Sequence, residues 1–162
     1  MENLAITMEC LRDLVAFHTE RISGYEAMLN KLAPDEQHLG TLFNAFIKQS
    51  ANMKDELLQM GSLWGLDEEQ LQHPGRYGLA WSMVKAVFFS RMPSYSLDKC
   101  KSGENALLIA YHSVEGTHGL QDPVRLLVNR QKREVIEARD WIAHFSTLLP
   151  RTERKEELAV MS

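Results

Sequence analysis

Apolar side chains recur along the chain in alternating steps of three and four residues, the spacing of one face of an α-helix. The first stripe starts at Leu4 and continues for about four heptads, which is typical of a helix packed in a bundle. It therefore predicts a helix over 4–32. Pro34 ends this helix, and the short connection that follows favours an antiparallel neighbour. The stripe consists of Leu4, Met8, Leu11, Val15, His18, Ile22, Tyr25, Leu29 and Leu32.

Four more helices follow from the same pattern. The second is predicted over 38–60, with Gly61 as its stop, because glycine commonly ends helices. A strongly apolar segment at 75–92 and a third stripe at 96–116 predict two more. The last helix is predicted over 123–149, and Pro150 follows it directly.

The segment between the second and third stripes decides the topology. Residues 61–74 are predicted to form a loop with room for one turn of helix. A helix over 75–92 would span about 27 Å, enough to carry the chain from one end of a bundle to the other. The second and third bundle helices would then be parallel, as in ferritin-like bundles with one crossover. We therefore predict an all-α fold, a ferritin-like four-helix bundle over 1–150, followed by a charged tail over 151–162.

Composition is that of an ordinary globular protein. Of 162 residues, 44% are hydrophobic and 25% are charged, so an extended disordered chain is not expected. The 18 basic and 22 acidic residues give a formal net charge of -4, and no nucleic-acid partner is expected. Cys10 and Cys100 are the only thiols, which excludes a disulfide framework. We see neither a secretory signal nor a membrane-spanning run, and we expect a cytoplasmic protein.

Several segments together resemble a bacterial ferritin-like four-helix-bundle family of unknown function, over roughly 7–149. The resemblance implies a ferritin-like bundle and brings no established reaction with it. Members of that family tend to carry Ala-His-Asp in the fourth helix, where this chain has Ala138, Arg139 and Asp140, so a ligand role for that histidine is not carried over. The matching segments are Arg21-Ile-Ser-Gly-Tyr-Glu26, Phe46-Ile-Lys-Gln-Ser50, Met53-Lys-Asp-Glu-Leu57, the run from Cys100 to Tyr111, and Arg130-Gln131.

Polar side chains interrupt the apolar stripes at a few inward positions. Two pairs share the same spacing of seven residues, His18 with Tyr25 and Glu104 with Tyr111, so each pair lies on one face of its helix. We predict a buried hydrogen-bonded layer, because a buried carboxylate is tolerated only with polar partners. Its predicted members are His18, Tyr25, Glu26, Ser50, Glu104, Tyr111 and Gln131.

A metal site is the alternative interpretation of the same positions. Ferritin-like carboxylate proteins use a Glu from each of two helices and a Glu-x-x-His motif from each of the other two. Here those motifs are missing, since the one literal match, Glu115 to His118, straddles the predicted glycine end of a helix. We therefore expect no cofactor, with iron or manganese as the alternative. The candidate ligands for that alternative are His18, Glu26, Glu104 and Glu134.

The sequence favours a non-catalytic helical bundle with a structural or stress-associated role, and the alternative is a ferritin-like metal-binding protein or metal-dependent oxidoreductase. We expect a homo-oligomer, because Trp81, Phe88 and Phe89 give the 75–92 helix more apolar surface than a crossover needs. We do not expect this helix to bind a membrane surface. If Glu104 belongs only to a hydrogen-bond layer, Glu104→Gln should cost about 1–2 kcal/mol.

Overall fold

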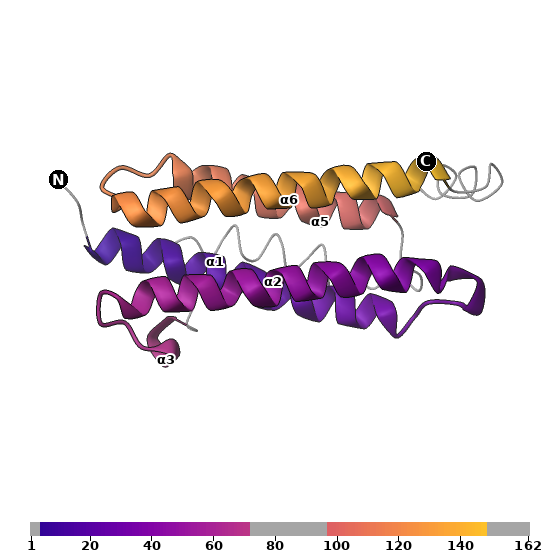
Figure 1. The fold of residues 1–162 in the computed structure, drawn as a ribbon, viewed down its shortest axis with the longest axis horizontal. Coiled ribbons are helices and arrows are strands. Elements are labelled where there is room, and N and C mark those ends of the chain that lie inside the picture. Colours follow the sequence, from indigo (N-terminus) through magenta and orange to yellow (C-terminus); the bar gives the residue numbers. More distant parts are fainter. Residues whose placement is uncertain (1–3, 72–96, 149–162) are drawn as a thin grey trace.

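The computed structural model describes residues 4–71 and 97–148, and every regular element in these two ranges is helical (Figure 1). The four long helices end within three residues of their predicted bounds, so the all-α prediction is confirmed for the described chain. The long helices are α1 (Leu4–Leu29), α2 (His38–Ser62), α5 (Leu97–Glu115) and α6 (Asp122–Leu148), and the short ones are η1 (Pro34–Glu36) and α3 (Glu68–Leu71).

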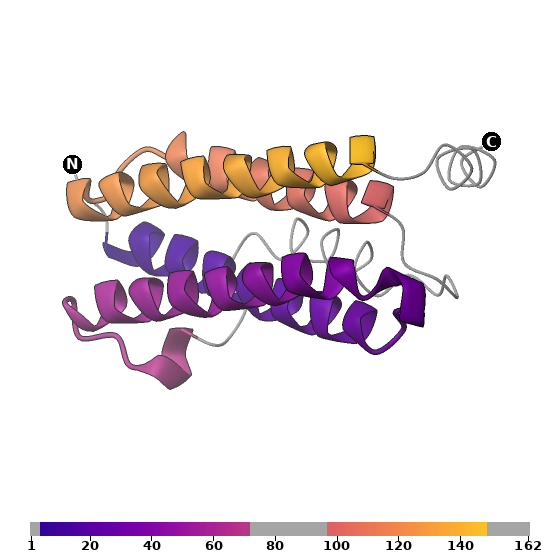
Figure 2. The same cartoon turned by 45° about the vertical axis from the view of Figure 1, so that its right-hand side comes forward.

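The long helices form two antiparallel hairpins, α1 with α2 and α5 with α6, which lie against each other (Figures 1 and 2). Both views show α2 and α5 running in the same direction, as predicted. Helix α3 lies at one end of the helices and α5 begins at the other. The predicted crossover helix over 75–92, with Trp81, Phe88 and Phe89, lies outside the described residues, as does the tail over 151–162.

The apolar stripes meet in a continuous core. The Tyr25 ring of α1 packs between Phe43 and Phe46 of α2, with both centroid distances 5.3 Å. Between the hairpins, the Cys100 thiol of α5 lies 3.6 Å from the Met28 sulfur of α1. These contacts bury apolar surface within and between the hairpins, which is the main stabilising contribution for such a fold.

Gly61 has a different role from the predicted one. Helix α2 continues through Gly61 to Ser62, so this glycine is not the stop. A side chain at Gly61 would overlap the Leu71 methyl of α3, which shows that the position is small because α3 packs directly against it. The left-handed backbone, with a φ of 77°, occurs at Gly65 instead. Glycine is favoured there because it lacks a Cβ.

Within the two described ranges, no helix combines the length and apolar character that crossing a lipid bilayer requires.

Candidate functional site

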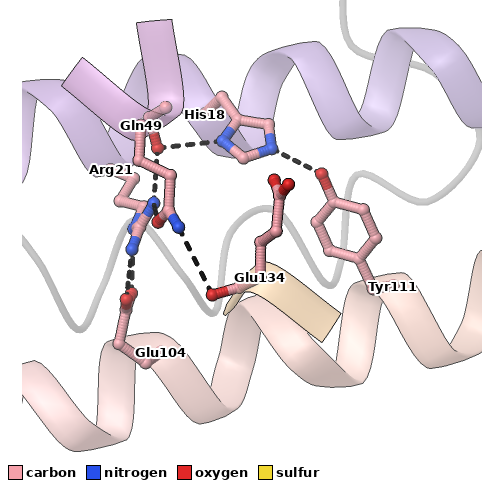
Figure 3. A network of polar contacts seen from close by, with 7 residues as sticks. His18, Arg21, Gln49, Glu104, Tyr111 and Glu134 are labelled. Atoms are coloured by element: carbon pink, nitrogen blue, oxygen red, sulfur yellow. Dashed lines mark hydrogen bonds and ion pairs between the residues drawn. The ribbon is translucent and has the colours of Figure 1, made fainter. Parts of the chain in front are cut away.

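A layer of polar side chains lies between the two hairpins (Figure 3). Helix α1 contributes His18 and Arg21, which share a face because they are three residues apart. All but one of the residues in the layer are fully buried, and Gln49 is partly exposed. The fully buried members are His18, Arg21, Ser50, Glu104, Tyr111 and Gln131.

The centre of the layer is an ion pair between α1 and α5. The Nε of Arg21 donates to Glu104 Oε2 at 2.9 Å, and the Nη2 of Arg21 donates to Glu104 Oε1. Both carboxylate oxygens are thus bound by one planar guanidinium, a geometry that lysine cannot reproduce. Burial by itself lowers the pKa of Arg21, but the neighbouring Glu104 outweighs it and raises this pKa above its ordinary value. Arg21 is therefore a permanent cation inside the bundle.

The rest of the guanidinium is bound by α2. Its Nη1 donates to Gln49 Oε1 at 2.8 Å and to Ser50 Oγ at 2.9 Å. The Cζ atom lies 5.1 Å from the centroid of the Phe46 ring and 5.8 Å from that of Tyr25, within cation–π range. The amide of Gln49 also donates to the Glu134 carbonyl at 3.3 Å and so links α2 to α6. One arginine thus has partners on three of the long helices and, through Gln49, a link to the fourth.

The second part of the layer is a chain of hydrogen bonds through His18. Ser50 Oγ lies 2.9 Å from His18 Nδ1, and the Tyr111 hydroxyl lies 2.6 Å from His18 Nε2. Tyr111 donates to Gln131 Oε1 at 2.6 Å, and Gln131 donates to the Met53 carbonyl at 3.1 Å. These contacts connect all four long helices.

The single proton on each hydroxyl sets the direction of this chain. Because Tyr111 gives its proton to Gln131, it can only accept from His18 Nε2, which must carry the ring proton. His18 Nδ1 then accepts from Ser50, whose oxygen accepts from Arg21. Every donor from Arg21 to Gln131 therefore has an acceptor when His18 is neutral.

The electrostatics agree with this proton arrangement. Burial, and then the positive charges of Arg21 and Lys54, lower the pKa of His18 to about 3. Burial likewise raises the pKa of Tyr111, which keeps its hydroxyl protonated at neutral pH. His18 is therefore a neutral imidazole and Tyr111 a neutral phenol.

The structure brings most of the predicted layer together. His18, Ser50, Glu104, Tyr111 and Gln131 are connected through hydrogen bonds that include Arg21, and Tyr25 is buried with its ring beside the same guanidinium.

The prediction for Glu26 is not met, because Glu26 is exposed on the surface of α1. Residue 26 lies about 100° around the helix from the buried Tyr25, so the two side chains leave α1 in different directions.

Sequence reasoning missed Arg21 and Gln49. Arg21 lies three residues after His18 and four before Tyr25, so the helical spacing that selected those two also selects Arg21. This spacing could have identified Arg21 as a member of the layer. A buried arginine needs a carboxylate partner, and Glu104 was already predicted to lie on the inward face of its helix. No pattern in the sequence identifies Gln49 as a member of the layer. It lies at the partly exposed edge of the layer, beside the inward position of Ser50.

The four candidate metal ligands do not form a common donor set. Glu26 is exposed, and Glu134 accepts from Arg130 at 3.3 Å at the partly exposed rim of the layer. Both oxygens of Glu104 are bound by Arg21, and both nitrogens of His18 by hydroxyls. Within 4–71 and 97–148, no group of three or more His, Cys, Asp or Glu residues is placed to hold a metal ion. The described residues do not fit an iron or manganese centre, which would need several carboxylates.

No family model, no curated protein and no solved structure matches the chain. The resemblance to a ferritin-like family therefore stays a prediction.

Proposed function

We propose that this chain is a non-catalytic, ferritin-like helical bundle, in which the buried layer has the structural task of joining two hairpins in one register. The observation that carries the proposal is that six side chains of the layer, all except the partly exposed Gln49, are fully buried and bind one another. A catalytic group must touch its substrate, and these groups are enclosed and already bound. The parallel course of α2 and α5 supports the ferritin-like topology.

The distribution of charge in the layer supports a role in choosing the partner hairpin. The α1–α2 hairpin contributes the cation Arg21, and the α5–α6 hairpin contributes the anion Glu104. Two copies of the α1–α2 hairpin facing each other would bring two buried cations together. A slip of one helical turn would move the partners by about 5.4 Å, beyond hydrogen-bond range. The layer therefore favours one pairing and one register, as buried polar residues do in coiled coils.

Large exposed side chains on the α5–α6 hairpin support an association role. Ile109, Leu126 and Trp141 are 62%, 73% and 56% exposed. We expect light scattering to detect a homo-oligomer at high protein concentration. A strict monomer under those conditions would remove association from the proposal.

The decisive experiment measures metal in protein purified without chelator or affinity tag. We expect no stoichiometric iron, manganese or zinc, and a melting temperature that does not respond to chelator. Glu26→Gln is the matched control for Glu104→Gln, because it removes an exposed carboxylate from the same candidate set. One or two equivalents of metal, lost in Glu104→Gln or His18→Ala but kept in Glu26→Gln, would overturn the proposal in favour of a metal-binding protein or oxidoreductase.

A further inference from the structure

His18 lies at the contact between the two hairpins, with surroundings suited only to a neutral ring. Its partners are hydroxyl groups, Ser50 on α2 and Tyr111 on α5. Two cations act on it, Arg21 on its own helix and Lys54 on α2. The Glu104 carboxylate on α5 is bound by Arg21 rather than by His18.

Within the described chain, the groups beyond Tyr111 bring no carboxylate into contact with His18. On α6 the next member of the chain is Gln131, which has no ionisable group. The acidic side chains near it, Glu56 on α2 and Glu134 on α6, both bind Arg130. The described helices therefore bring cations and hydroxyls, and no contacting carboxylate, to the imidazole.

A proton on His18 would disrupt the chain at Ser50. With His18 neutral, the Ser50 hydroxyl accepts from Arg21 and donates to His18 Nδ1. With His18 charged, Nδ1 becomes a donor, so the Ser50 oxygen faces two donors and its own proton loses its acceptor. A second positive charge would also lie beside Arg21 in the buried interior, which is strongly unfavourable.

We infer that His18 is an acid-sensitive latch, at which protonation of the ring separates the α1–α2 hairpin from the α5–α6 hairpin. This inference rests on the joining role proposed above and adds a means of regulating it. The latch is closed when His18 is neutral, because only then does each group between Arg21 and Gln131 have its partner.

The pH range follows from linkage. The pKa of His18 is lowered from 6.5 to about 3 in the folded chain, first by burial. Between these two values the separated state binds the proton and the closed state does not, so closure weakens as the pH falls. The linked proton raises the opening equilibrium constant by up to tenfold per pH unit, which amounts to about 50-fold between pH 6.5 and 4.5 and about 100-fold between pH 7.5 and 4.5. Above about pH 7.5 the latch has almost no pH dependence, because His18 is then neutral in both states.

The first test compares urea unfolding of the full chain from pH 7.5 to 4.5 for wild type, His18→Gln and His112→Gln. Glutamine offers one donor and one acceptor without titrating, and His112 is an exposed histidine on α5 that serves as the matched control. We expect the unfolding constant of wild type and His112→Gln to rise by about 100-fold more than that of His18→Gln over this range. Equal pH dependence in all three proteins would overturn the latch.

The same experiment separates this inference from the proposed function. A His18→Gln protein that is less stable than wild type by the same factor at every pH would refute the latch and leave the joining role intact. A His18→Gln protein as stable as wild type at every pH would also refute the latch, and the joining role would stand, because glutamine can keep both hydrogen bonds. Should this variant fail to fold, the His18 pKa measured by NMR titration of wild type decides, since a value near 6.5 would overturn the latch.

The second test asks whether acid separates the hairpins or unfolds them. Cys100 on α5 is buried against Met28 on α1, so its labelling by a disulfide reagent active in acid reports separation. At pH 4.5 we expect Cys100 labelling in wild type to accelerate at least tenfold relative to His18→Gln, while the far-ultraviolet helix signal is retained. Labelling that appears only together with loss of helix signal would show global unfolding and overturn hairpin separation.

Discussion

The guanidinium of Arg21 and the carboxylate of Glu104 meet at two points in the centre of the molecule, although 83 positions separate them in the chain. Each belongs to a different hairpin, and both side chains are fully buried. Removing either partner would leave the other as a buried and uncompensated charge. Replacing only one of the two residues therefore destabilises the fold far more than replacing both with apolar residues.

We predict that Glu104→Gln lowers the free energy of unfolding by about 3–5 kcal/mol at pH 7, measured by urea denaturation. This exceeds the 1–2 kcal/mol expected from the sequence, because the structure places a permanent cation against the carboxylate. A loss below about 1 kcal/mol would show that Arg21 finds other compensation.

A double variant and an exposed pair provide the controls. Arg21→Met combined with Glu104→Leu removes both charges and should be more stable than Glu104→Gln alone, because no buried charge remains unpaired. The Arg130–Glu56 pair is partly exposed, and Arg130→Met should cost no more than about 1 kcal/mol.

Tyr111→Phe removes one hydroxyl from the middle of the hydrogen-bond chain. We expect it to lower the free energy of unfolding by about 1–3 kcal/mol, because the Nε2 proton of His18 and the Oε1 of Gln131 both lose their partner in a buried place. Thermal or urea unfolding measures this loss. Stability equal to that of wild type would contradict the connected chain.

The tautomer of His18 is open to direct observation. We predict that Nε2 carries the proton and that Nδ1 accepts, which nitrogen-15 NMR of the imidazole distinguishes. The exposed His112 on α5 should show the averaged signals of exchanging tautomers and serves as an internal reference. A proton found on Nδ1 would reverse the direction assigned to the chain between Arg21 and Gln131.

Gly61→Ala tests the packing of α3 against α2. A Cβ at this position would overlap the buried Leu71 side chain, so we expect a loss of about 1 kcal/mol despite the better helix propensity of alanine. Gly116→Ala is the control, because the nearest atom to its Cβ would be the His112 carbonyl oxygen at 3.5 Å, an ordinary contact. In a Leu71→Ala background, Gly61→Ala should become stabilising, and a loss there would show that Leu71 is not the obstacle.

The buried layer was predicted only in part from the sequence. Its members were predicted from polar residues at inward helical positions, and five of the seven are joined by hydrogen bonds in the structure. Of the other two, Tyr25 is buried beside them and Glu26 is exposed. Arg21 was not among the predicted members because the apolar stripe predicted for 4–32 passes through Ile22. The inward face of a helix is wide enough to include both Arg21 and Ile22. Only the placement of the α5–α6 hairpin shows that the inner side of α1 faces a carboxylate at this point.

The sequence by itself determined the four long helices of the described ranges and the direction in which they run. Helix formation depends on contacts three and four residues apart, which are visible as the spacing of Leu11, Val15 and their neighbours. The pairing of Arg21 with Glu104, the proton order through His18 and the close approach at Gly61 were decided only by the tertiary structure. These contacts join residues from different elements, and their geometry is set by how the hairpins pack, which no local spacing records.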